Sequence, residues 1–82
     1  MTTLFVAGLP KRVDQYELEN LFRQCGRVES VTVWWNFEIG EAAGWAFVDM
    51  AKEWGAERAI RQLNGTFWHG RRLRVTEARS RE

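Results

Sequence analysis

Aromatic side chains are the groups in this sequence with the most to offer chemically. Its 82 residues include five tryptophans and five phenylalanines, more than one small core can absorb, so some rings must lie at the surface. Trp45 and Phe47 lie two positions apart in an alternating segment, and Phe5 stands between two aliphatic residues near the N-terminus. Flat aromatic faces exposed on a sheet can stack on other planar groups. The predicted chemistry is therefore noncovalent recognition.

Side chains that could make or break covalent bonds are scarce. The chain has one cysteine, Cys25, and one histidine, His69, so a disulfide framework is impossible and a metal site would lack ligands. Cys25 lies on the apolar face of a predicted helix and is expected in the core, while His69 is expected to be solvated in a loop. The sequence shows no nucleophile with a base, no carboxylate dyad and no phosphate loop. We predict no cofactor and no enzymatic activity.

Four β-prone segments are available to position the aromatic rings. Each combines β-branched or aromatic residues with turn residues at its ends, which is the pattern of a short strand. They cover residues 4–7, 28–35, 44–50 and 71–78. Residues 36–43, between the second and third strands, are expected to form a loop.

Two further segments have the apolar spacing of amphipathic helices. The first is predicted to begin at Gln15, after a capping box made by Asp14 and Glu17, and to end where Gly26 takes a left-handed conformation. The second helix lies within residues 52–65 and ends in an Asn-Gly pair. It lacks a good capping residue at its start, and a glycine weakens its first turn.

The resulting order, βαββαβ, predicts an α+β fold of the ferredoxin-like type. Two helices should pack on one face of a four-stranded antiparallel sheet and leave the other face bare, in a single domain over residues 1–82. Side chains alternate along a strand, so if Val6 and Val48 point toward the helices, then Phe5, Trp45 and Phe47 point to solvent.

Two motifs resemble the signatures of the RNA-recognition-motif family. The hexamer at residues 4–9 reads Leu-Phe-Val-Ala-Gly-Leu, and the octamer at residues 43–50 reads Ala-Gly-Trp-Ala-Phe-Val-Asp-Met. The resemblance spans nearly the whole chain, which is similar in compactness to small single-domain bacterial members. It implies that Phe5, Trp45 and Phe47 stack on the bases of single-stranded RNA.

Residues around this platform have predicted roles with open alternatives. Trp34 has the same outward parity and is expected either to provide a fourth stacking surface or to pack across the strands. Arg72 and Arg74 have outward parity in the last strand and, with Arg79, are expected near phosphates; the alternative is a solvated strand that pairs with acids such as Asp49. Base selectivity is expected from groups at the platform edges, with candidates at Thr32, Asp49, Thr76 and the backbone near Ala78.

The charges depart from the family pattern. Ala43 stands where the octamer usually has a lysine or arginine, and the preceding loop carries Glu38 and Glu41. The formal net charge is only +1. Few phosphate contacts are therefore expected, and the binding of nucleic acid should depend only modestly on salt.

The surplus aromatic residues support a rival hypothesis. Trp35 is expected at the edge of the core and Trp68 under the second helix, whereas Trp54 and Phe67, if exposed, fit a protein contact. In this reading the domain is degenerate, and it binds a protein partner or forms a weak homodimer through its exposed tryptophans.

The expected partner is single-stranded RNA, and single-stranded DNA remains an open alternative because stacking does not read the 2′-hydroxyl. The sequence contains neither a leader-like N-terminus nor an apolar run long enough for a membrane span. Its single cysteine suits a reducing compartment. We expect an intracellular, cytoplasmic protein, with the nucleus as the alternative.

Overall fold

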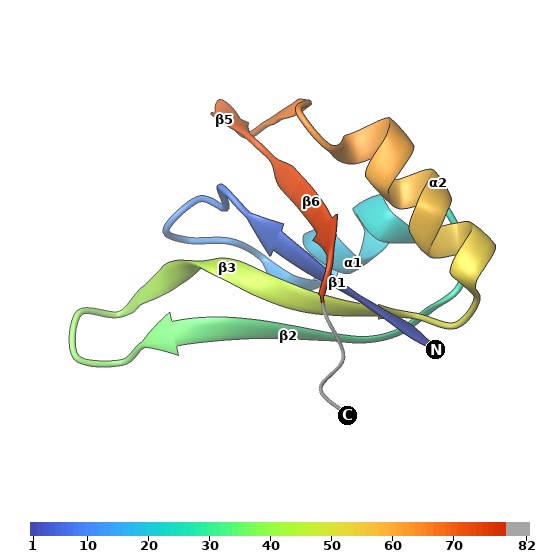
Figure 1. The fold of residues 1–82 in the computed structure, drawn as a ribbon. Helices are drawn as coiled ribbons and strands as arrows, with labels where there is room; N and C mark the ends of the chain where they lie inside the picture. The colour runs from blue at the N-terminus through green and yellow to red at the C-terminus, as the bar shows by residue number, and fades with distance from the viewer. Residues whose placement is uncertain (79–82) are drawn as a thin grey trace.

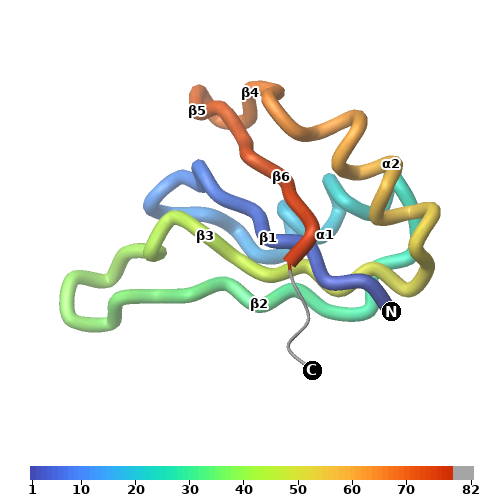
Figure 2. The backbone as a smooth tube through the Cα atoms, in the orientation of Figure 1, coloured from blue at the N-terminus to red at the C-terminus, as the bar shows by residue number. Residues whose placement is uncertain are grey.

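The computed structural model describes residues 1–78 as one sheet covered on one face by two helices (Figure 1). The elements are β1 (Thr2–Ala7), α1 (Gln15–Arg23), β2 (Val28–Asn36), β3 (Glu41–Met50), α2 (Glu53–Leu63), β4 (Phe67–Trp68), β5 (Arg71–Arg72) and β6 (Arg74–Glu77). The main sheet has the strand order β2-β3-β1-β6, and all of its neighbours are antiparallel. The backbone trace shows β4 and β5 as a separate ribbon beyond the end of α2 (Figure 2). The predicted α+β fold is confirmed.

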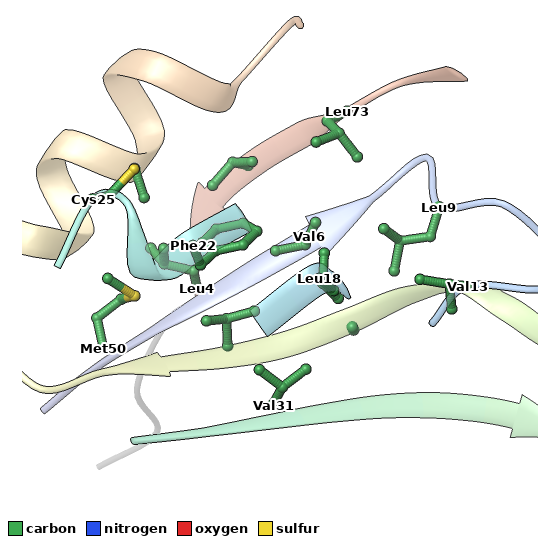
Figure 3. Packing of buried hydrophobic residues seen from close by; sticks show 14 of the residues in the cluster. Leu4, Val6, Leu9, Val13, Leu18, Phe22, Cys25, Val31, Met50 and Leu73 are labelled. Carbon is green, nitrogen blue, oxygen red and sulfur yellow. The ribbon is translucent and has the colours of Figure 1, made fainter. Parts of the chain in front are cut away.

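The core lies between the helices and one face of the sheet (Figure 3). In the two central strands, Leu4 pairs with Val48 and Val6 with Ala46, and all four side chains are fully buried. Phe22 of α1 is the largest side chain packed against them. Within residues 1–78 no polar or charged side chain is buried. The predicted inward positions are therefore correct, and the sheet has one apolar face and one open face.

Helix α1 begins at Gln15 as predicted, but the capping box is only half formed. The Asp14 carboxylate accepts a hydrogen bond from the Tyr16 N–H at 2.9 Å. The Glu17 carboxylate does not return to the cap; its Oε1 lies 2.7 Å from His69 Nε2, in the turn between β4 and β5. His69 is exposed in this turn, as predicted, and Glu17 is a partner that the sequence did not reveal. Because both side chains are about half exposed, the pair contributes at most about 1 kcal/mol.

Gly26 has a different role from the one predicted. It is not among the glycines with positive φ in residues 1–78, so it is not a left-handed cap. A methyl group at Gly26 would instead lie 3.0 Å from the Cα of Gly55 in the first turn of α2. The two glycines let the end of α1 and the start of α2 approach closely. This contact explains why α2 tolerates Gly55, although glycine lowers helix propensity by about 1 kcal/mol.

The last strand is interrupted, so the prediction of one strand over 71–78 is wrong. The buried Leu73 turns its backbone toward the loop after α2, where its N–H donates to Thr66 O at 2.7 Å and its carbonyl accepts from Gly65 N–H at 2.8 Å. These bonds separate Arg72, in the ribbon, from Arg74, in the main sheet. The prediction of a loop over 36–43 is also too long, because β2 runs to Asn36 and β3 begins at Glu41.

The structure places no helix in residues 1–78 that is long and apolar enough to cross a membrane.

Gly8 at the end of β1 allows the chain to pass close to β5, which gives a first prediction. Gly8 and Gly40 both have positive φ, of 81° and 69°, but only a methyl group at Gly8 would overlap a neighbour, the carbonyl oxygen of Arg72. Gly40→Ala should lower the free energy of unfolding by about 1–2 kcal/mol for backbone strain alone. Gly8→Ala should cost a further ~1–3 kcal/mol. Urea denaturation of both variants checks this, and equal losses would contradict the close approach.

Candidate binding face on the open sheet

The three predicted platform residues lie together on the open face of the sheet. Phe5 pairs directly with Phe47 across β1 and β3, and Trp45 pairs with Ala7 in the next outward row. The ring centroids of Phe5, Trp45 and Phe47 are 5.7–5.8 Å apart in each pair. All three side chains are partly exposed, because they alternate with the buried residues of the same strands.

Trp34 of β2 joins these three rings. Its ring stacks on Trp45 with centroids 4.9 Å apart and an interplanar angle of 23°, and meets Phe47 edge-on at 5.5 Å. Trp34 directly follows Val33, which pairs with Ala46, and the β2–β3 pairing becomes irregular between Val33 and Trp35. Trp34 packs across the strands and still has 42% of its surface exposed. We call Phe5, Trp34, Trp45 and Phe47 the aromatic cluster.

The predicted arginines occupy different places. Arg74 of β6 pairs with Ala7, so it lies on the open face one strand away from Trp45. Arg72 is outside the main sheet, with its guanidinium 5.0 Å from the centre of the Phe67 ring. Arg79 lies outside the described residues. The ion pairs found in residues 1–78 involve neither Arg72 nor Arg74, so the expected alternative of pairing with Asp49 is not seen.

The opposite end of the open face carries a carboxylate. Asp49 pairs with Thr3 of β1 on one side and with Ser30 of β2 on the other. The Thr3 hydroxyl donates to Oδ1 at 2.5 Å, and the Ser30 hydroxyl donates to Oδ2 at 2.6 Å. Sequence reasoning missed Ser30, which lies opposite Asp49 in the regular register that β2 keeps with β3 from Ser30 to Val33. Thr32 pairs with Phe47 and Thr76 pairs with Phe5, so both threonines lie in the row of the Phe5–Phe47 pair.

The structure decides the exposure of three of the surplus aromatic residues. Trp68 is half-buried against the core, as predicted. Trp54 and Phe67 are exposed, and Trp54 holds the Arg58 guanidinium 5.3 Å from its ring centre.

Trp35 is not at the edge of the core, so that prediction is wrong. It is 36% exposed and lines a shallow pocket with neighbours that include Phe37. Its parity is inward, but the end of the β2–β3 hairpin projects past both helices, so no helix covers it there (Figure 1).

The residues that could bind a metal ion or react as a thiol do not gather on the open face within residues 1–78. Residues 1–78 contain no group of three or more His, Cys, Asp or Glu side chains that could hold a metal ion. Cys25 is buried on the other side of the sheet, with its Sγ 3.8 Å from Gln62 Oε1. Burial raises the pKa of the Cys25 thiol, an effect that the nearby Arg58 charge opposes only in part. Cys25 therefore belongs to the core, as predicted.

The buried thiol gives a second prediction. Because its pKa is raised, the thiolate fraction of Cys25 at neutral pH is even smaller than that of a free cysteine, and a reagent has no access to it. A disulfide reagent should therefore modify the native protein only as fast as it unfolds. The rate, followed by absorbance, should rise steeply with urea. Rapid modification without denaturant would contradict this.

The chain belongs to the RNA recognition motif family, whose sequence model matches residues 4–74. It is 36% identical over 80 residues to the putative RNA-binding protein RbpD of Nostoc sp., covering 98% of this chain and 85% of that protein. A Sex-lethal homologue of Chrysomya rufifacies is 40% identical over 78 residues, which are 95% of this chain but 25% of that relative. This chain thus spans about a quarter of the Sex-lethal relative. A solved Sex-lethal protein–RNA complex superposes with a TM-score of 0.90 at 36% identity, over 99% of this chain and 48% of that chain.

The predicted similarity to small bacterial members is confirmed. Besides RbpD, the putative RNA-binding protein RbpF of Nostoc sp. is 34% identical over 80 residues, which are 98% of this chain and 76% of that protein. These relatives resemble the chain over most of their own length.

Proposed function

We propose that this chain binds single-stranded RNA on the open face, with bases stacked on Phe5, Trp45 and Phe47. The observation that carries the proposal is the aromatic cluster itself, four partly exposed rings, each within 6 Å of its neighbours, on the face opposite both helices. A cluster of this kind on an uncovered sheet is a typical sign of a binding site. The proposal is supported by the solved Sex-lethal protein–RNA complex and by the names of the bacterial relatives.

Stacking explains why the ligand should be single-stranded. A base stacked on an aromatic side chain contributes about 1–3 kcal/mol, whichever base it is. In a duplex the faces of the bases are already covered by their neighbours, so the cluster has nothing to stack on. Trp34 adds to this platform, because it stays 42% exposed while it stacks on Trp45. Single-stranded DNA is bound by the same contacts unless a group on the protein reads the 2′-hydroxyl.

Arginine side chains supply the contacts with phosphate. Arg74 lies on the open face one strand away from Trp45, and Arg72 lies on the separate ribbon, with its guanidinium 5.0 Å from the centre of the Phe67 ring. Arg79 is assigned the same role from its sequence position alone. These are few charges for a polyanion ligand, so stacking rather than backbone neutralisation dominates the affinity.

The rival function is a protein contact or self-association through exposed tryptophans. Trp54 is 54% exposed on α2, on the helical side of the sheet, and is available for such a contact. The two functions thus use tryptophans on opposite sides of the molecule, which allows a matched comparison.

Replacing one tryptophan on each side tests the proposed function. Trp45→Ala should weaken the binding of a labelled pool of short random RNA about tenfold or more, because it removes a base-stacking surface. Trp54→Ala should bind RNA like the parent. Fluorescence anisotropy gives the affinities, and amide spectra show whether each variant is folded. Equal effects of the two changes, or no binding by the parent at millimolar RNA, would reject the proposal; association that rises with protein concentration and is lost in Trp54→Ala would favour the rival.

Salt dependence tests the role of the arginines. On a single strand each phosphate contact adds about 0.7 to the slope of log K against log salt. Arg74→Gln should therefore lower this slope by about 0.7, while Arg61→Gln, an exposed change on α2, should leave it unchanged. Binding measured between low and moderate salt for the parent and both variants checks this. A slope unchanged by Arg74→Gln means that Arg74 does not contact phosphate.

A further inference from the structure

A held carboxylate lies at one end of the binding face. Asp49 is two residues beyond Phe47 in β3 and shares its outward parity. Two hydroxyls from the flanking strands, Thr3 on β1 and Ser30 on β2, each donate to one of its oxygens at 2.5 and 2.6 Å. The side chain is therefore fixed in orientation on the open face, beside the Phe5–Phe47 row.

This carboxylate is poorly placed for a phosphate backbone. No ion pair among residues 1–78 neutralises it. The predicted phosphate contact within the described residues of the main sheet, Arg74, pairs with Ala7, four residues along β1 from Thr3, which corresponds to roughly 14 Å. A phosphate near Asp49 would meet a like charge that no ion pair within residues 1–78 offsets. The donors on the edge of a base therefore suit Asp49 better than a phosphate does.

The chemistry of a carboxylate selects among the base edges. An ionised carboxylate only accepts hydrogen bonds and has about four acceptor positions, of which the two hydroxyls take two. The Watson–Crick edge of guanine presents two adjacent N–H donors. Adenine, cytosine and uracil each present a donor beside an acceptor. The acceptor would face a negatively charged carboxylate oxygen and be repelled by it. A bidentate pair of charge-assisted bonds is thus available to guanine alone.

The distance suits a base that stacks on the platform. Rows on the same face of a strand are two residues apart, or roughly 7 Å, so a base on Phe47 or Phe5 extends its edge into the row of Asp49. Resting on the RNA-binding function above, we propose that Asp49 selects guanine at this end of the face. Thr3 and Ser30 act as positioning residues, because they hold the carboxylate without contacting the base.

Binding of short RNA hexamers tests the inference. The probes are all-uridine RNA and the same hexamer with a single central guanine, adenine or cytosine; adenine controls for the stronger stacking of a purine. The guanine hexamer should bind about tenfold more tightly than the adenine hexamer, the effect of a hydrogen bond to a charged group. Asp49→Asn keeps the shape of the side chain but offers one acceptor and one donor. It should reduce the guanine-to-adenine ratio to about one.

Two further variants separate selectivity from general charge and from folding. Glu77→Gln also removes one negative charge, from an exposed position on β6, and should keep the preference for guanine. Ser30→Ala keeps the Asp49 charge but frees one side of the carboxylate, and should lower the preference severalfold in a folded protein. Loss of the guanine preference in Glu77→Gln would count against the proposal. An unchanged preference in folded Ser30→Ala would also count against it.

The outcomes distinguish this inference from the proposed function. If all hexamers bind equally, or if the guanine preference survives in Asp49→Asn, the selectivity proposal is overturned while RNA binding stands. If none of the hexamers binds the parent at millimolar concentration, both proposals are overturned.

Discussion

The antiparallel register of β1 with β3 places Leu4 opposite Val48 and Phe5 opposite Phe47. Side chains alternate along each strand, so this single pairing puts aliphatic residues under the helices and aromatic residues together on the other face. A slip of one residue in either strand would bury an aromatic ring among the helices and expose an aliphatic side chain to water. The core and the binding face therefore depend on the same pairing, and the hydrophobic core stabilises the arrangement of the aromatic rings.

The open face divides into three regions along the strands. Aromatic rings occupy the middle, Arg74 lies at the end near the ribbon, and Asp49 lies at the other end between two hydroxyls. In the proposed binding mode, a neutral stacking surface between opposite charges would give the bound strand a direction, because phosphates and base edges would be attracted to different ends. A low net charge is thus compatible with binding that relies on stacking.

Several local predictions failed because a distant segment competed for the same group. Glu17 fits a capping box with its own helix, but it pairs with His69 from a turn that the fold brings alongside. Gly26 has the position of a helix cap, yet it serves a backbone contact with Gly55. Leu73 lies in a segment that alternates like a strand, but the loop after α2 takes its backbone hydrogen bonds. In each case the local sequence pattern was present, but a contact with a distant segment determined the conformation or the hydrogen bonds of the residue.

The sequence by itself determined the order of elements and which side chains share a face, because capping, apolar spacing and alternation are local properties. Phe5, Trp45 and Phe47 could therefore be grouped by their alternation with aliphatic neighbours alone. Only the tertiary structure decided which residues of neighbouring strands meet, such as Trp34 with Trp45. Strand register and its irregularities are set by packing between segments far apart in the chain, and β2 breaks its register with β3 twice.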